Sequence, residues 1–142
     1  MKFAVLILAA ALAACAPPPP QSIEITHAWA RPSPGGVDIA AGYLTIVNHA
    51  DTADELQSAS SPRAGRIDLH VTEMSDGMMH MHDAHGLTVA PGDTLTLAPG
   101  GAHLMFQRLS APFQLGETVP VTLHFAHAGD VQATLTVRQQ EN

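Results

Sequence analysis

The sequence predicts an all-β protein, a single domain that forms a β-sandwich or β-barrel. Three observations support this prediction. The apolar segments are short, rich in Val, Ile, Leu and Thr, and separated by clusters of Gly, Pro, Asp and Ser. Within them apolar and polar residues alternate, as they do in strands with one buried face. No long segment with a helical period intervenes, and turn-punctuated strands of this kind are typical of sandwiches and barrels.

Residues 1–14 predict a lipoprotein signal peptide. Lys2 precedes an apolar run that ends at Ala14 and is too short to span a membrane. The segment Leu12-Ala13-Ala14-Cys15 resembles a bacterial lipobox, and cleavage before Cys15 would leave this sole cysteine lipidated. The alternative is a soluble export signal that happens to contain a cysteine. We expect a protein of the bacterial cell envelope, held on the periplasmic side by the lipid at Cys15.

Residues 15–22 form the predicted tether between the lipid and the folded domain. Its four consecutive prolines, Pro17–Pro20, favour an extended, semi-rigid spacer. The formal net charge of −7 makes the chain poorly suited to nucleic acid or to an anionic membrane surface. We therefore expect no nucleic-acid partner, and membrane attachment through the lipid alone.

The remaining residues, 23–142, are enough for one domain with its own core. After Cys15 the chain has no cysteine, so this domain has no disulfide. The clearest strand pair is a hairpin of the last two predicted strands, which lie on either side of Gly129-Asp130. The predicted strands are, in order, 23–30, 41–49, 65–73, 94–98, 102–109, 118–127 and 131–138.

Alternation turns the histidines of two strands away from the core. In the strand 65–73, Leu69 belongs to the apolar face, which leaves His70 on the other face. In the strand 102–109, Leu104 is apolar, and His103 and Met105 share the opposite face. An exposed methionine beside an exposed histidine has little packing reason to exist, which favours a metal site.

Together with Met81, these residues offer two imidazoles and two thioethers. Thioethers are soft and uncharged, so they bind Cu(I) well and hard cations poorly, whereas imidazole binds several transition metals. Zinc sites normally use Cys, His and carboxylates, and blue-copper sites need a cysteine thiolate. The set therefore indicates Cu(I). Gly77 is expected to make a tight turn that brings Met81 back over His70.

The segment around Met81 contains further possible ligands. His80, His82 and His85 are expected in one loop, and a short His-rich tract can bind a second, weaker Cu(II). We expect His80 and His82 to point away from Met81, which they flank. Three more methionines are either filler or reserve thioethers used while copper is handed on: Met74, Met78 and Met79.

The spacing of the four candidate ligands resembles that of the periplasmic copper chaperone family called PCu(A)C. Ten residues separate His70 from Met81, twenty-one separate Met81 from His103, and one separates His103 from Met105. The resemblance extends from about residue 23 to 137. Further matching segments flank the ligands: Ala28–Pro34, Asn48, Gly77–Met79 and Pro99–Met105.

This resemblance implies a cupredoxin-like Greek-key β-sandwich whose Cu(I) ligands are His70, Met81, His103 and Met105. It also implies delivery of copper to the binuclear CuA centre of cytochrome c oxidase. The expected partners are the copper domain of oxidase subunit II and a thiol-based copper chaperone that assists the transfer.

Two alternatives remain open. An envelope copper sink would need the same ligands as a chaperone. An enzyme resembling copper-zinc superoxide dismutase would need a His-rich, carboxylate-assisted site, and this ligand set is too rich in thioethers for that. The sequence has no nucleophile triad and no pair of carboxylates at a spacing typical of catalytic groups. We therefore expect a protein that is not an enzyme.

Overall fold

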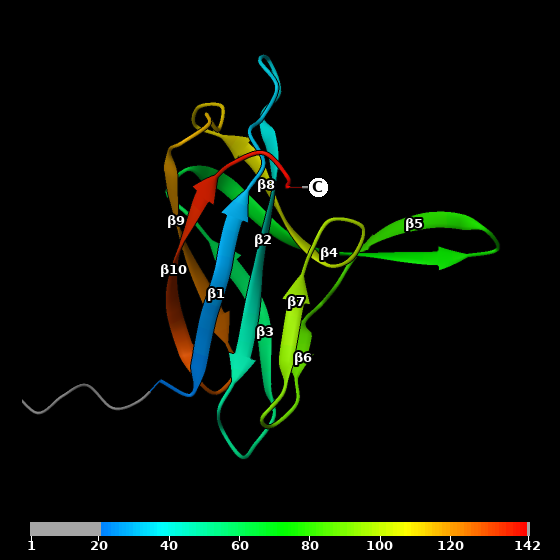
Figure 1. The fold of residues 1–142 in the computed structure, drawn as a ribbon, viewed down its shortest axis with the longest axis vertical. Helices are drawn as coiled ribbons and strands as arrows, with labels where there is room; N and C mark the ends of the chain where they lie inside the picture. The colour runs from blue at the N-terminus through cyan, green and yellow to red at the C-terminus, as the bar shows by residue number, and fades with distance from the viewer. Residues whose placement is uncertain (1–20, 142) are drawn as a thin grey trace, which may run out of the picture.

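The computed structural model describes residues 21–141, which form ten β-strands and the loops that connect them (Figure 1). The all-β fold predicted from the sequence is confirmed. Within this range no helix is long and apolar enough to cross a membrane. The strands are β1 (Ile23–Ala30), β2 (Ile39–Asn48), β3 (Asp54–Ser60), β4 (Ala64–Ser75), β5 (Met78–Asp83), β6 (Leu87–Val89), β7 (Thr94–Leu97), β8 (His103–Leu109), β9 (Thr118–Phe125) and β10 (Gly129–Val137).

The signal peptide predicted at 1–14, Cys15 and most of the tether lie outside the described residues. The predictions made for them stay predictions.

The strands form one continuous sheet in the order β5-β4-β8-β2-β1-β10-β9-β3-β6, with β7 added to β2. All neighbouring pairs are antiparallel except β1 with β10. The sheet curls so that β3 also lies against β4, although the two strands are distant in the strand order (Figure 1). Curling places the apolar faces of opposite strands against each other, as in a sandwich or barrel.

Alternating side chains from both sides of the curled sheet fill the core. The predicted hairpin of the last two strands is confirmed as β9 paired with β10, in which Val121 and Leu123 are buried. Each large apolar side chain buried in this way contributes roughly 1.5–3 kcal/mol to stability. The largest fully buried residues are Phe106, Phe113, Ile23, Leu44, Ile46, Leu56, Leu97, Leu104, Leu123 and Leu135.

Three strands were not predicted from the sequence. In β3 a register shift between Leu56 and Ser58 spaces the buried Leu56 and Ala59 three residues apart, which hides the two-residue period. All six residues of β5 are exposed, so no apolar alternation marks this strand. The prediction of a loop at His80–His85 is therefore wrong: His80 and His82 lie in β5, and only His85 follows it. β6 has just three residues.

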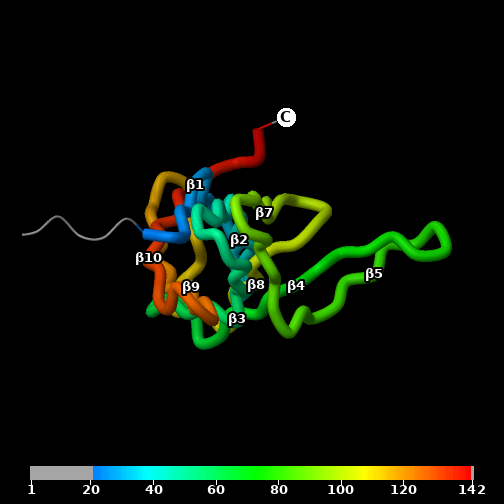
Figure 2. The backbone as a smooth tube through the Cα atoms, turned by 90° about the horizontal axis from the view of Figure 1, so that it is seen from below, coloured from blue at the N-terminus to red at the C-terminus, as the bar shows by residue number. Residues whose placement is uncertain are grey.

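The hairpin of β4 and β5 extends beyond the body of the sheet (Figures 1 and 2). Its turn consists of Asp76 and Gly77, whose φ angles are 52° and 75°. Positive φ at both central residues is the requirement of the type I′ turn, which suits glycine and aspartate. The tight turn predicted at Gly77 is thus confirmed, and its two-residue loop fixes the register of the whole hairpin.

Asp54 is a buried carboxylate at the start of β3. It accepts backbone N–H bonds from His127 (2.9 Å), Ala128 (2.8 Å) and Glu55 (2.8 Å). Burial raises the pKa of the carboxyl, but these three donors outweigh that effect and hold the pKa below its ordinary value. The ionised side chain therefore ties the β9–β10 turn to β3.

We predict that Asp54→Ala lowers the free energy of unfolding at neutral pH by about 1–3 kcal/mol, because three part-buried backbone donors lose their acceptor. A carboxyl whose pKa is depressed in the folded state stabilises the fold above its unfolded pKa, and this contribution disappears as pH falls through the folded pKa. The difference between wild type and variant should accordingly shrink in acid. Urea denaturation at several pH values measures it. The exposed Asp51→Ala should match wild type, and an equal loss in both variants would contradict the assignment.

Candidate metal centre

Strand β4 lies between β5 and β8, and its register brings the four candidate ligands to one face. His70 stands opposite His103 of β8, while Met81 of β5 stands opposite Thr72. Met105 stands opposite Asp68. Residues directly opposite in an antiparallel ladder share a face, as do residues two apart in a strand. The prediction that both ligand strands turn these side chains away from the core is confirmed.

His103 is more enclosed than the sequence indicates, with only 5% of the residue exposed. Its Nδ1 lies 3.1 Å from the carbonyl oxygen of Gly101 in the turn before β8, and the ring of Tyr43 lies 6.4 Å away between centroids. A carbonyl can only accept, so Nδ1 carries the proton and Nε2 keeps the lone pair. The expectation of an exposed His103 is wrong, because residues from other segments cover a face that alternation alone would leave open.

His70 is held from the other side by Asp83 of β5. Its Nε2 lies 2.7 Å from Asp83 Oδ1, which makes Nε2–H the donor in the neutral ring. Its Nδ1 is buried and has no hydrogen-bond partner among the described residues. A buried ring nitrogen with a lone pair and no donor is costly unless it binds something, so it fits a metal ligand. The rings of His70 and His103 meet edge to face at 5.4 Å.

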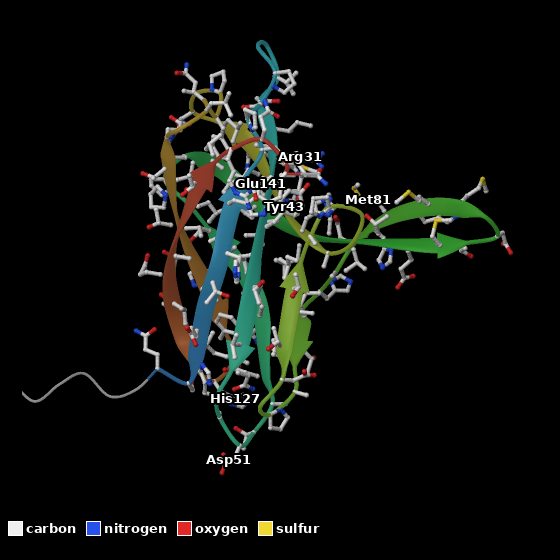
Figure 3. All side chains as sticks on the ribbon, viewed as in Figure 1. Arg31, Tyr43, Asp51, Met81, His127 and Glu141 are labelled. Carbon is white, nitrogen blue, oxygen red and sulfur yellow. The ribbon has the colours of Figure 1, made fainter. Side chains whose placement is uncertain are left out.

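The thioethers border a cavity of about 380 Å³ at the base of the hairpin. Met81, Met105 and His103 line it, whereas His70 does not. Met79, interpreted from the sequence as filler or a reserve thioether, lines the same cavity. Figure 3 shows Met81 on the same side of the molecule as Arg31 and Tyr43, where the hairpin leaves the body. Three of the four candidate ligands therefore meet at one opening.

Aromatic and cationic side chains form the edge of this opening. Tyr43 lines the opening and packs on the buried Trp29 with ring centroids 4.6 Å apart. Burial raises the pKa of the Tyr43 hydroxyl, and the nearby Arg31 partly opposes this rise. Tyr43 consequently stays neutral at physiological pH. The guanidinium of Arg138 covers Trp29 at 4.5 Å from the ring centroid.

The auxiliary histidines lie apart from this face. His80 and His82 stand opposite Glu73 and Val71, so they occupy the other face of the hairpin from Met81, as predicted. His85 follows β5 and borders a separate cavity of about 300 Å³. A second metal bound by these three residues stays a prediction.

Carboxylates also approach His70. Within residues 21–141, one group of His and acidic side chains brings its ligand atoms within 4.8 Å of one another, namely Asp68, His70 and Asp83. Asp68 is already engaged, because it accepts bonds from Arg66 and Gln107. Asp83 accepts from His70. These carboxylates hold their neighbours in place, so the candidate metal ligands remain the two imidazoles and the two thioethers.

Asp83 is the functional residue that the sequence reasoning missed most clearly. A signal for it existed: a two-residue turn at Asp76-Gly77 sets Ser75 opposite Met78 and, counting back, His70 opposite Asp83. Tyr43 had no comparable signal, because its place beside His103 depends on the pairing of β2 with β8, two strands distant in sequence.

Comparisons with known proteins identify the family to which this chain belongs. A family model described as "Putative lipoprotein LpqE-like" matches residues 23–137, which include all ten strands. A protein of Leifsonia xyli named "Putative lipoprotein Lxx21020" is 30% identical over 117 residues, which cover 82% of this chain and 69% of that protein. An uncharacterized protein of Rickettsia prowazekii is 24% identical over 108 residues, or 73% of this chain and 60% of that protein.

Solved structures share the fold. The copper-bound PCuAC domain from PmoF2 is similar with a TM-score of 0.72 and 27% identity, over 84% of this chain and 94% of that domain. The solution structure of CuI-DR1885 from Deinococcus radiodurans has a TM-score of 0.65 and 31% identity, over 85% of this chain and 83% of that chain. The similarity confirms the cupredoxin-like fold expected from the sequence.

We predict that Asp83→Ala removes the preference of His70 for the Nε2–H tautomer, because the carboxylate that accepts this proton is lost. Imidazole ¹⁵N chemical shifts of the metal-free protein at mildly alkaline pH measure the tautomer directly. Asp130→Ala is the matched control, since Asp130 accepts from His124 at 2.7 Å in the same way. That control should alter His124 and leave His70 unchanged. Unaltered His70 shifts in Asp83→Ala would contradict the assigned role.

Proposed function

Since the chain belongs to the LpqE-like lipoprotein family, we propose that it is a Cu(I)-binding metallochaperone of the cell envelope. The observation that carries the proposal is the meeting of two imidazoles and two thioethers on one face of the sheet, from β4, β5 and β8. The relatives of known structure include copper-bound PCuAC domains, which supports copper as the cargo. The ligands are His70, Met81, His103 and Met105.

The donor atoms suit Cu(I) in particular. His70 offers Nδ1 and His103 offers Nε2, each fixed by a partner on the other ring nitrogen. Two thioethers complete a soft, uncharged set that stabilises the monovalent ion more than Cu(II) or zinc. Because only the imidazoles can be protonated, affinity should fall in acid through the two histidines alone.

We predict one tightly bound Cu(I) per chain, with Met105→Ala weakening Cu(I) by about 10- to 100-fold or more, the cost typical of disturbing even an outer-shell partner. Zinc affinity should change much less, because zinc gains little from a thioether. Competition against a Cu(I) chelator measures the affinity. His124→Ala is the control, because His124 pairs with Asp130 on β9 and β10. Equal loss of both metals in Met105→Ala would show that the thioether is not a ligand.

The proposed acceptor is the copper domain of cytochrome c oxidase subunit II, assisted by a thiol protein that keeps the acceptor cysteines reduced. Thiolates bind Cu(I) more strongly than thioethers do, so transfer to a two-cysteine centre runs downhill. No oxidation or proton release from the donor thioethers is needed.

Mixing the Cu(I)-loaded protein with that copper domain tests the proposal directly. After separation, we expect copper on the acceptor, and much less transfer from a His103→Ala donor because it loads poorly. Copper that stays on the wild-type donor, together with normal oxidase activity in a deletion strain at low copper, would favour an envelope copper sink instead.

A carrier is proposed rather than an enzyme, although the structure does bring a triad-like row together. Ser60 Oγ lies 3.0 Å from His124 Nε2, and His124 Nδ1 lies 2.7 Å from Asp130. The sequence spacing gave no sign of this row. Ser60 and Asp130 are exposed, and acyl transfer needs an enclosed, preorganised oxyanion site beside the nucleophile. These three side chains therefore form a surface hydrogen-bond network that links β3, β9 and β10.

The proposed location is the periplasmic side of the cell envelope, with the chain anchored through Cys15. The lipobox-like Leu12–Cys15 segment and the lipoprotein relatives support this proposal. Mass spectrometry of the mature protein should find more than one acyl chain at Cys15, because one chain alone anchors only marginally. Cys15→Ser should lack fatty acid. An unmodified wild-type N-terminus at another residue would overturn the anchor.

A further inference from the structure

The β4–β5 hairpin carries an unusual amount of exposed thioether. Met74, Met78, Met79 and Met81 have exposed fractions of 68%, 60%, 61% and 55%. Figure 3 shows sulfur atoms along the hairpin, away from the body of the sheet. Apolar side chains of this size are normally withdrawn from water, so four of them on one exposed hairpin require another explanation.

The register sorts these methionines between the two faces of the hairpin. Met74 stands directly opposite Met79, and Met81 is two residues beyond Met79 on the same strand. These three therefore share the face of His70, whereas Met78, opposite Ser75, lies on the other face. Directly opposite residues have Cβ atoms about 4.5–5.5 Å apart, and residues two apart in a strand are separated by about 6.6 Å.

Such spacing suits a shared Cu(I). The methionine side chain is unbranched with three rotatable bonds, so two thioethers on opposite residues can meet at one ion. The hairpin itself is anionic, because it contains Glu73 and Asp76 and no Lys or Arg occurs in residues 70–83, and the nearest cationic side chain at the cavity is Arg31 of the body. An anionic segment with soft donors attracts and holds a monovalent cation.

The hairpin face is continuous with the four-ligand site of His70, Met81, His103 and Met105, which we call the inner site. Met79 and Met81 both line the cavity that contains His103 and Met105. Met79 thus borders the inner ligands while also standing opposite Met74 nearer the tip. The enclosed His103, 5% exposed, is poorly accessible to an acceptor's thiolates, whereas Met74 and Met79 are open to solvent.

We propose that Met74 and Met79 form an outer Cu(I) station, to which copper moves from the inner site before an acceptor takes it. The inference rests on the proposed function. In the transfer, the bonds from Cu(I) to the neutral imidazoles of His70 and His103 and to the thioethers of Met81 and Met105 break as bonds to Met79 and Met74 form. The ion stays monovalent and no proton moves, since a thioether has none to lose. The inner site stores the ion and the outer station presents it.

Methyl NMR of the mature chain, with ¹³C-labelled methionine methyl groups, tests this station. Cu(I) is added anaerobically under reducing conditions. In the first phase, up to one equivalent, we expect the signals of Met81 and Met105 to shift. In a second, weaker phase, the signals of Met74 and Met79 should shift, while Met78 on the opposite face stays unchanged.

Two variants test whether the second phase depends on the outer station in particular or on any exposed methionine of the hairpin. Met74→Ala, which removes the thioether of the station that does not line the inner cavity, should lose the second phase, keep the first equivalent at unchanged affinity, and transfer copper to a two-cysteine acceptor severalfold more slowly. Met78→Ala is the matched control, because it removes an equally exposed thioether from the other face, and it should behave as wild type.

The outcomes distinguish this inference from the proposed function. If no first equivalent of Cu(I) binds, the proposed function itself fails. If the first equivalent binds but the second phase is absent, or Met79 shifts together with Met81 in the first phase, the outer station is overturned alone. Equal slowing of transfer by Met78→Ala would also overturn it, because any exposed thioether would then serve.

Discussion

The pairing of β4 with β8 is the constraint on which the site depends. Leu69 stands opposite Leu104, and both are buried in the core, while the next pair along the ladder is His70 opposite His103. Since neighbouring residues in a strand point to opposite faces, burial of the leucines forces both imidazoles onto the other face. A slip of one residue would exchange leucines and histidines, so the hydrophobic core that sets the register also positions the candidate metal ligands.

Three of the four candidate ligands sit on strands anchored in the core, and the fourth, Met81, does not. The imidazoles sit on strands anchored in the core, and each ring is oriented by a second residue, Asp83 or Gly101. Met81 sits on β5, an edge strand whose six residues are all exposed and whose ladder contacts are with β4 alone. Segments with few buried contacts open at low free-energy cost. An imidazole pair oriented by fixed partners, together with a thioether on a strand that can open at low cost, suits the proposed carrier, which must both hold and release copper.

How far the sequence could predict this structure depends on whether a segment has one buried face. Alternation identified the strands of His70 and His103 because Leu69 and Leu104 mark their core face. It failed for β5, where neither face is buried, and for β3, where the bulge after Leu56 breaks the period. The resemblance to the PCu(A)C family is confirmed by the family and structural matches. The burial of His103 could not be predicted, because Tyr43 reaches it through a pairing between distant segments.

The open thioethers of the hairpin also make the protein sensitive to oxidants. Solvent-accessible methionine is converted to its sulfoxide, whose polar, chiral group no longer offers the soft sulfur donor that Cu(I) prefers. The described part of the chain contains no cysteine to react first. Oxidative damage would therefore fall on Met74, Met78, Met79 and Met81 and spare the enclosed His103. Because methionine sulfoxide reductases reverse this lesion, the copper transfer proposed for the hairpin would depend on the repair capacity of its compartment.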